Sequence, residues 1–168
     1  MQAIDILIET HGRSRGVCHR VLQGLDAEGA NWRPDGGHNS ITWLVWHIAR
    51  EQDAQIAHMS GAEQVWLASG WADRFALDLP RESMGYGHTA AEAGRVVVSD
   101  LSLLTGYLDA AADATAAYLH GLDPDCLDEV VDTRWDPPVT RGVRLVSIID
   151  DASQHAGQAA YVRGLQGL

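Results

Sequence analysis

The sequence contains no lysine, so all 12 of its basic residues are arginines. Against 23 acidic residues, they leave a formal net charge of −11. The arginines do not gather into a stripe or cluster, and a phosphate backbone is repelled by such a distribution of charge. We therefore expect neither nucleic acid nor an anionic membrane surface among the partners of this chain.

Cysteine is also scarce, with only Cys18 and Cys126 present. Two cysteines are too few for a disulfide scaffold or a thiolate zinc cage, so we expect two reduced thiols. No uninterrupted apolar run reaches the roughly 18 residues that a membrane-spanning helix needs. The first residues include Asp5 and Glu9, whereas a signal peptide begins with a basic region. These absences predict a cytoplasmic protein.

Several motifs of well-known enzyme classes are missing. The sequence has no G-x-G-x-x-G fingerprint, no phosphate-binding loop ending in G-K-[ST] and no H-E-x-x-H zinc motif. It also lacks the repeated Glu residues with E-x-x-H spacing that hold a di-iron centre in a helical bundle. Dinucleotide binding, nucleotide hydrolysis and di-iron chemistry are not expected.

Apolar residues recur with a helical period in four segments that are separated by loops rich in Gly, Pro and Asp. Thr89 and Glu92 match a capping box at the start of the third segment. The chain is about the length of one domain, and four long helices predict an all-α four-helix bundle in a single domain over residues 1–168. We expect long helices over 4–25, 40–59, 89–119 and 144–165, a short helix near 62–69 and a partly extended segment at 128–135.

Three polar residues fall within the apolar stripes of the second and fourth predicted helices. Asp151 and His155 are four residues apart, so both side chains point from the same face of the fourth helix. His47 lies near the middle of the second helix, between Trp46 and Ile48. Two imidazoles and a carboxylate match the three-ligand pattern of a catalytic zinc site, which keeps one position open.

The same residues also fit a simpler interpretation. His155 and Asp151 would form a buried ion pair, and His47 would make a separate hydrogen bond, because a buried polar group needs a partner. Glu51 is either a further group near His47 or a solvated charge beside Arg50. We expect the other histidines to be structural or exposed, namely His11, His19, His38, His58, His88 and His120.

Six tryptophans are many for this length. They either pack the core and loops or form an apolar wall over a cleft at the mouth of the bundle. Arg134, beside Trp135, would pair there with an anionic group or else with a surface acid. The six are Trp32, Trp43, Trp46, Trp66, Trp71 and Trp135.

Two segments resemble the DinB-like superfamily, and in particular its thiol-dependent transferases and mycothiol-dependent maleylpyruvate isomerases. They read N-S-I-T-W-L-V-W-H-I-A-R from Asn39 and D-A-S-Q-H-A-G-Q-A-A-Y-V-R-G-L from Asp151. The turn Gly-Tyr-Gly-His-Thr before the third helix matches as well. The resemblance implies a bundle with up-down-down-up topology and a divalent metal, zinc foremost and nickel as the alternative. Its ligands map onto His47, Asp151 and His155, with Asp151 standing where relatives have His or the longer Glu.

The resemblance also implies a low-molecular-weight thiol as cosubstrate, because a metal lowers the pKa of a bound thiol and favours the nucleophilic thiolate. The leading hypothesis is a metal-dependent S-transferase that joins mycothiol, or a similar thiol, to an electrophile. An isomerase of the maleylpyruvate type is the first alternative and would need Arg134 or Arg141 in the metal cleft. A non-catalytic metal-binding stress protein is the second. Faces rich in Ala and Leu are also compatible with a homodimer.

Overall fold

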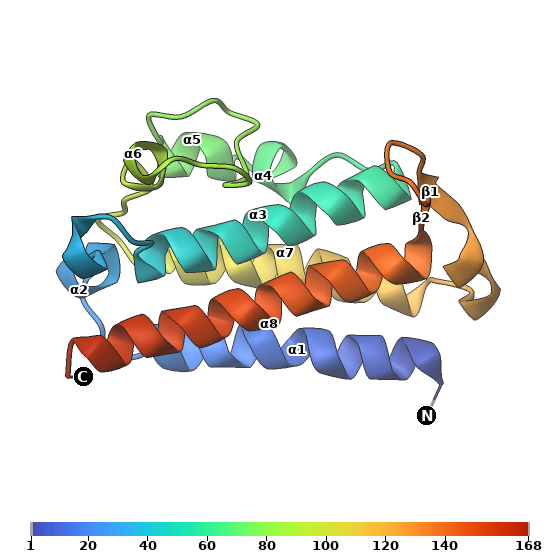
Figure 1. Ribbon diagram of the computed structural model, residues 1–168, viewed down its shortest axis with the longest axis horizontal. Helices are drawn as coiled ribbons and strands as arrows, with labels where there is room; N and C mark the ends of the chain where they lie inside the picture. The colour runs from blue at the N-terminus through green and yellow to red at the C-terminus, as the bar shows by residue number, and fades with distance from the viewer. Residues whose placement is uncertain (1, 168) are drawn as a thin grey trace.

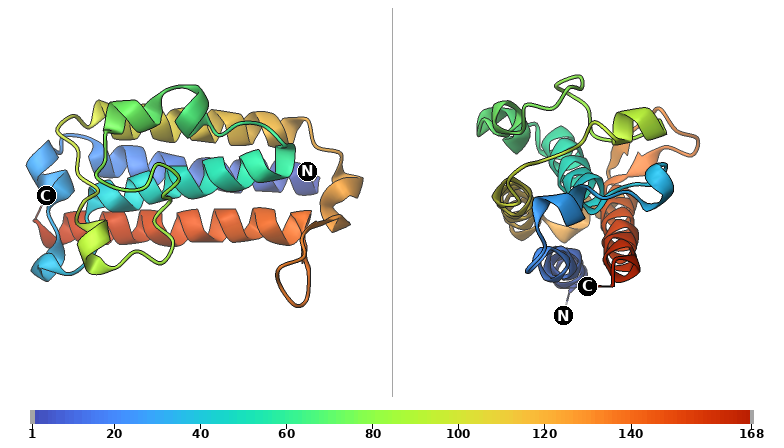
Figure 2. Two further views of the ribbon diagram at one scale, coloured as in Figure 1. Left: turned by 90° about the horizontal axis from the view of Figure 1, so that it is seen from above. Right: turned by 90° about the vertical axis from the view of Figure 1, so that its left-hand side faces the viewer.

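Four long helices run along the computed structural model, which describes residues 2–167 (Figure 1). Helices α1 and α8 run in one direction and α3 and α7 in the other (Figure 1). Both α1 and α3 pack against α7 and α8, as the end-on view of Figure 2 shows. The expected four-helix bundle with up-down-down-up topology is confirmed. The four helices are α1 (Ala3–Leu22), α3 (Ile41–Ser60), α7 (Ser102–His120) and α8 (Arg141–Leu165).

Local sequence signals fix where α3 and α8 begin and end. The hydroxyls of Ser40 and Thr140 accept hydrogen bonds from backbone N–H groups in the first turns of α3 and α8. Helix α3 ends at Gly61, which adopts the left-handed conformation with φ 72° that favours glycine. These caps set the register of the two helices that carry the candidate metal ligands.

A long crossover covers the outer side of α3. Because α3 and α7 run in the same direction, residues 61–101 must return along the bundle before α7 can begin. This segment contains α4 (Val65–Ala68), α5 (Trp71–Phe75) and α6 (Ala90–Ala93), and it lies over α3 in Figures 1 and 2. The bundle covers one side of α3 and the crossover the other, so every residue from 41 to 54 is buried.

The third helix expected over 89–119 is wrong in its first half. The capping box of Thr89 and Glu92 is present, but α6 lasts a single turn and α7 begins only at Ser102. Between them, Val96 and Val98 are buried whereas Val97 is exposed, the alternation of an extended chain. β-Branched side chains favour this conformation. The side chain of Asn31 also accepts from the N–H of Val98 and donates to its carbonyl, so backbone groups that a helix would use are bound elsewhere.

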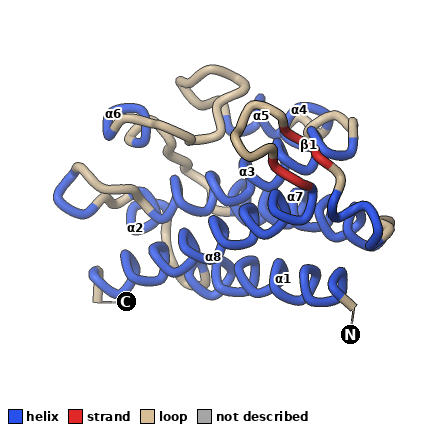
Figure 3. The backbone as a smooth tube through the Cα atoms, turned by 45° about the vertical axis from the view of Figure 1, so that its right-hand side comes forward, coloured by secondary structure: helices blue, strands red, loops and turns tan. Residues whose placement is uncertain are grey.

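The remaining elements are short. Helix α2 (Ala27–Asn31) and the 3-10 turns η1 (Pro34–Gly36) and η2 (Pro124–Asp128) lie in the connections. Strands β1 (Val130–Asp132) and β2 (Val139–Thr140) pair antiparallel, and β1 lies within the segment 128–135 that was expected to be partly extended. They are the red segments of Figure 3, at the end of the bundle where α8 begins. Within residues 2–167, no helix is apolar and long enough to span a bilayer.

Candidate metal centre

The structure brings His47, Asp151 and His155 together between α3 and α8. One ligand atom from each of these residues lies within 4.8 Å of the other two. The Nε2 atom of His47 is 3.7 Å from Oδ2 of Asp151, and Nε2 of His155 is 3.4 Å from Oδ1. These separations are longer than direct hydrogen bonds, which measure about 2.7–3.2 Å. Two imidazoles and one carboxylate thus face a common point without bonding tightly to one another.

Hydrogen bonds at the far side of each ring determine which nitrogen faces that point. Nδ1–H of His47 donates to the carbonyl of Met84 at 2.5 Å, and Nδ1–H of His155 donates to Oε1 of Gln158 at 2.8 Å. A neutral imidazole carries one proton, so both Nε2 atoms present lone pairs towards Asp151. Histidine ligands of metals are held in the same way by an acceptor behind the ring.

The Asp151 carboxylate supports the same interpretation. Its Oδ2 atom is buried and has no hydrogen-bond partner among the described residues. A buried acceptor without a partner is costly, and a cation coordinated there would remove that cost. The donor set of two imidazole nitrogens and one carboxylate oxygen fits a divalent metal such as zinc. These residues could therefore hold a metal ion.

The ion-pair alternative describes the same site without a metal. Burial lowers the pKa of His155, but its interactions with Asp151 and Gln158 outweigh this effect and raise it. The pKa of His47 is lowered because burial outweighs the hydrogen bond to Met84 and the attraction of Asp151. A proton on His155 would thus occupy the metal-free site, and a metal must displace it.

A loop packs directly against the first of these histidines. Gly85, in the Gly-Tyr-Gly-His-Thr turn, has φ 98°. A Cβ atom at Gly85 would lie 2.5 Å from Nδ1 of His47 and 3.0 Å from Cζ2 of Trp43. The ring of Trp43 stacks on that of His47 at 4.6 Å between centroids. His47 is therefore fixed by a tryptophan from its own helix and by a turn that tolerates no side chain.

Arg50 ties this loop to the helix. Its side chain is fully buried and donates to the carbonyl of Ser83 at 3.0 Å, one residue before Met84. It also donates to the Tyr107 hydroxyl and lies 3.5 Å from the Asp53 carboxylate. Asp53 in turn accepts from the hydroxyl of Tyr107 and from the backbone N–H groups of residues 65 and 66. The network holds two parts of the crossover, the start of α4 and Ser83, over α3.

Sequence reasoning missed this network and left two interpretations open for Glu51. The alternative of a solvated charge beside Arg50 is wrong, because the Glu51 side chain is buried and lines a cavity with Asp151. Burial raises the pKa of Glu51, and the charge of Asp151 raises it further. The only signal in the sequence was the run of charged and polar residues inside an apolar helical stripe.

A cavity of about 600 Å³ opens beside Asp151. Asp151 and Glu51 belong to its lining, which joins it to the candidate metal centre. Its volume is in the range of small-molecule sites, about 300–1,000 Å³. Helices α3 and α8 and two loops supply the remaining lining residues, which are Gln55, Met84, Tyr86, Arg134, Trp135, Arg144 and Ser147.

The two arginines considered from the sequence have different positions. Arg134 lines this cavity. Arg141 does not, because its guanidinium is bound to Glu129 at 2.8 Å and to the hydroxyl of Tyr118.

The tryptophans also differ in position. Trp46, Trp66 and Trp71 are buried, whereas Trp135 is exposed at the cavity.

The other histidines and both cysteines lie outside the three-residue cluster. His88 accepts from the Trp43 indole and contacts Ser83, and His19 pairs with Asp109. Cys18 is fully buried, and burial raises the pKa of its thiol to about 12. A thiol that stays protonated is a poor nucleophile, so Cys18 is unsuited to nucleophilic catalysis.

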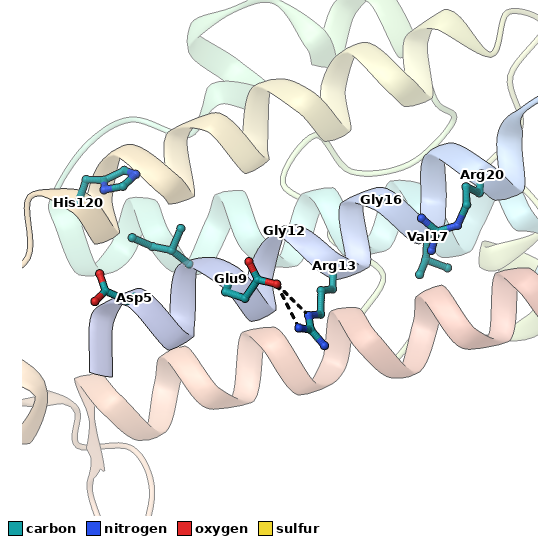
Figure 4. Close-up of a pocket in the computed structure, with 9 residues that line it drawn as sticks. Asp5, Glu9, Gly12, Arg13, Gly16, Val17, Arg20 and His120 are labelled. Carbon is teal, nitrogen blue, oxygen red and sulfur yellow. Dashed lines mark hydrogen bonds and ion pairs between the residues drawn. The ribbon is translucent and has the colours of Figure 1, made fainter. Parts of the chain in front are cut away.

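A second, larger groove runs along the outer face of α1 (Figure 4). Two of its charged groups, Arg13 and Glu9, pair along the helix. Residues 12–16 spell G-R-S-R-G there, but they lie inside a helix, and the hydroxyl of Ser14 donates to the His11 carbonyl. This segment matches the G-x-S-x-G pattern of some serine hydrolases, but the nucleophilic serine of those enzymes sits on a sharp turn between a strand and a helix. Ser14 is therefore not placed as a nucleophile, and we assign no active site to this groove.

Comparisons with known proteins agree with this geometry. A family model described as mycothiol-S-transferase matches residues 7–167. The crystal structure of a conserved protein from Enterococcus faecalis is similar, with a TM-score of 0.92 and 42% sequence identity. That match covers 97% of this chain and 96% of the other. No curated protein matches the sequence.

Proposed function

Because the chain belongs to the mycothiol-S-transferase family, we propose that it is a metal-dependent thiol S-transferase with mycothiol, or a similar low-molecular-weight thiol, as cosubstrate. His47, Asp151 and His155 would hold the metal. The observation that carries the proposal is the convergence of two imidazole lone pairs and an unpartnered carboxylate oxygen beside a cavity of ligand size.

The metal would lower the pKa of a thiol in its open position and so favour the nucleophilic thiolate. The residues of the chain prepare the site for this chemistry. The Met84 carbonyl and Gln158 keep the two imidazoles in the tautomer that presents Nε2. With two neutral histidines and one aspartate around a divalent ion, the centre would carry one net positive charge, which would favour an anionic sulfur as the next ligand.

The transfer needs no nucleophile from the protein. The sulfur of the thiol attacks an electrophilic carbon, a C–S bond forms, and the leaving group departs with its bonding electron pair. The thiol proton passes to solvent. Zinc suits the donor set best and nickel is the alternative.

An isomerase of the maleylpyruvate type is the second candidate, and one observation favours it. Arg134 lines the cavity, as binding of a carboxylate substrate requires. A dicarboxylate needs a second free cation, however, and Arg141 is engaged elsewhere. A non-catalytic metal-binding role has less support, because the cavity reaches Asp151 rather than being filled by a protein side chain.

The first test measures metal content by elemental mass spectrometry on tag-free protein. We expect near-stoichiometric zinc or nickel in the wild type and its loss, together with thiol-transfer activity, in His47→Ala and His155→Ala. His58→Ala is the matched control, since His58 lies on the exposed end of α3. A metal-free but active His155→Ala protein would contradict the proposal.

A further inference from the structure

Arg134 is held in place from one edge of its guanidinium only. Its Nε and Nη2 donate to the two carboxylate oxygens of Asp132 at 3.0 and 2.9 Å. Asp132 is itself buried and also accepts from Arg144 at 2.8 Å. The Arg134 side chain is 78% exposed, and within residues 2–167 nothing accepts from its Nη1. A guanidinium fixed in this way keeps donors free for a second carboxylate.

The charges around the cavity are arranged unevenly. Arg134 and Arg144, the two cations of the lining, both contact the Asp132 carboxylate at the hairpin. The acids Glu51 and Asp151 come from the two long helices, on the side of the candidate metal. In a chain of net charge −11, this arrangement directs an anionic group towards Arg134.

Exposed aromatic residues stand beside this arginine. Trp135 and Tyr86 both line the cavity and are 56% and 79% exposed. They come from two loops that are far apart in the sequence, the β1–β2 connection and the turn that holds His47. Large apolar surfaces exposed together in a concave site mark a place where a ligand binds. A flat apolar group would stack or pack against such rings.

We propose that this cavity binds an electrophile with a flat apolar body and a carboxylate, and that Arg134 is the residue that holds the carboxylate. The inference rests on the proposed function, since it names the substrate class for thiol transfer at the same site. Trp135 and Tyr86 contact the apolar body, and the reacting carbon faces Asp151 and the two histidines.

Aryl chlorides provide a matched pair of probes. The pair is 4-chloro-3,5-dinitrobenzoate, which carries a carboxylate, and 4-chloro-3,5-dinitrobenzamide, which is uncharged. In both, the thiol sulfur bonds to the carbon that bears chlorine, the C–Cl bond breaks, and chloride leaves with the electron pair while the thiol proton goes to solvent. The reaction is the same, so the difference between them reports on recognition of the carboxylate.

The experiment compares kcat/KM for both probes in zinc-loaded protein with mycothiol. We expect Arg134→Gln to lower kcat/KM about tenfold for the benzoate, the size of one lost charge-assisted hydrogen bond, and less than twofold for the benzamide. Arg134→Lys should recover part of the loss. The control is Arg13→Gln, whose side chain is similarly exposed at 74% but lies on α1, and it should behave as the wild type. Equal losses for both probes, or no loss, would overturn the inference.

Two further measurements distinguish failure of the carboxylate-site inference from failure of the proposed transferase function. Binding of 3,5-dinitrobenzoate, which has no leaving group, is measured by calorimetry and should weaken in Arg134→Gln whether or not the protein turns over. Weaker binding without turnover of any probe would support the carboxylate site and refute the transferase. Replacing mycothiol by glutathione, which carries carboxylates, tests whether Arg134 binds a carboxylate of the thiol instead of one on the electrophile. An Arg134→Gln loss that follows the thiol rather than the electrophile would overturn the assignment.

Discussion

Gly85 shows how closely one residue can govern the candidate metal centre. It combines a positive φ with contact against the His47 ring, so it satisfies two demands that a side chain would violate. The next residue but one, Gly87, shares the positive φ, at 72°, but a Cβ atom there would have nothing within 4 Å. Comparing Gly85 with Gly87 therefore distinguishes the effect of backbone strain from the effect of contact with the His47 ring.

We expect Gly85→Ala to weaken metal binding by about 10- to 100-fold, the usual effect of disturbing a residue behind a ligand. The added methyl would push the turn away from His47 and break the hydrogen bond to Met84. Gly87→Ala carries similar strain without that contact and should keep wild-type metal affinity. Competition with a chromophoric chelator measures both constants, and equal affinities in the two variants would contradict the role given to Gly85.

His11 gives a prediction about pH that does not involve the metal site. Burial between α1 and α7 lowers its pKa, more than the hydrogen bond to the Ala112 carbonyl raises it. Below the unfolded value of about 6.5, the unfolded chain therefore takes up a proton that the folded protein refuses. Stability from this group is present at neutral pH and is lost as the pH falls.

His11→Gln should reduce this loss, because glutamine stays neutral and can still donate to Ala112. The free energy of unfolding, measured with urea at pH 7.5 and 5.5, should fall less in the variant than in the wild type. The expected difference is at most about 1.4 kcal/mol per pH unit below 6.5. An equal fall in both proteins would show that His11 does not contribute.

At the scale of elements, α3 and the crossover depend on each other. The crossover buries the outer side of α3, and polar groups of α3 bind the crossover backbone in return. Arg50 and Asp53 are the centre of this exchange. A buried charge of this kind is stable only while its partner is present.

Arg50→Met should destabilise the protein by about 3–5 kcal/mol, since it leaves Asp53 buried without its cation. It should also weaken metal binding, because the Ser83 carbonyl loses its anchor next to Met84. Thermal unfolding and chelator competition test the two effects. The control Arg13→Met, on the exposed face of α1, should cost less than about 0.5 kcal/mol.

The sequence predicted the parts of the site that depend on helical spacing. Asp151 and His155 lie one turn apart, so any helix brings them together, and His47 followed from the apolar stripe around it. The contributions of Met84 and Gly85 could not be predicted in this way, because these residues reach the site through tertiary contacts. For Arg134, the sequence left open whether it faces a cleft or a surface acid. The error at Val96–Val98 has a similar cause, since a partner far away in the chain, Asn31, binds the backbone there.

At the scale of the molecule, metal binding and folding should be linked. The three candidate ligands belong to α3 and α8, which separate when the bundle unfolds, so the unfolded chain lacks the site. The absence of nucleic-acid partners, the cytoplasmic location and the homodimer remain predictions from composition and sequence pattern. The net charge of −11 also favours association with a cation in general.

Zinc at 100 times its dissociation constant should stabilise the fold by about 2.7 kcal/mol. For a domain of this size, that corresponds to a rise in Tm of roughly 5–10 °C. Scanning calorimetry of chelator-treated protein, before and after zinc is added back, measures the shift. His47→Ala should show almost none, and a full shift in that variant would place the bound ion elsewhere.

The order of the helices also has a consequence for biosynthesis. The candidate ligands lie on the second and the last of the four long helices, with α7 and the whole crossover between them in the chain. A polypeptide growing on the ribosome therefore presents His47 long before Asp151 and His155 exist. The complete ligand set can form only after α8 has left the exit tunnel and docked beside α3. Metal acquisition should thus follow the synthesis of α8, and the ion would be delivered to a bundle that has already assembled.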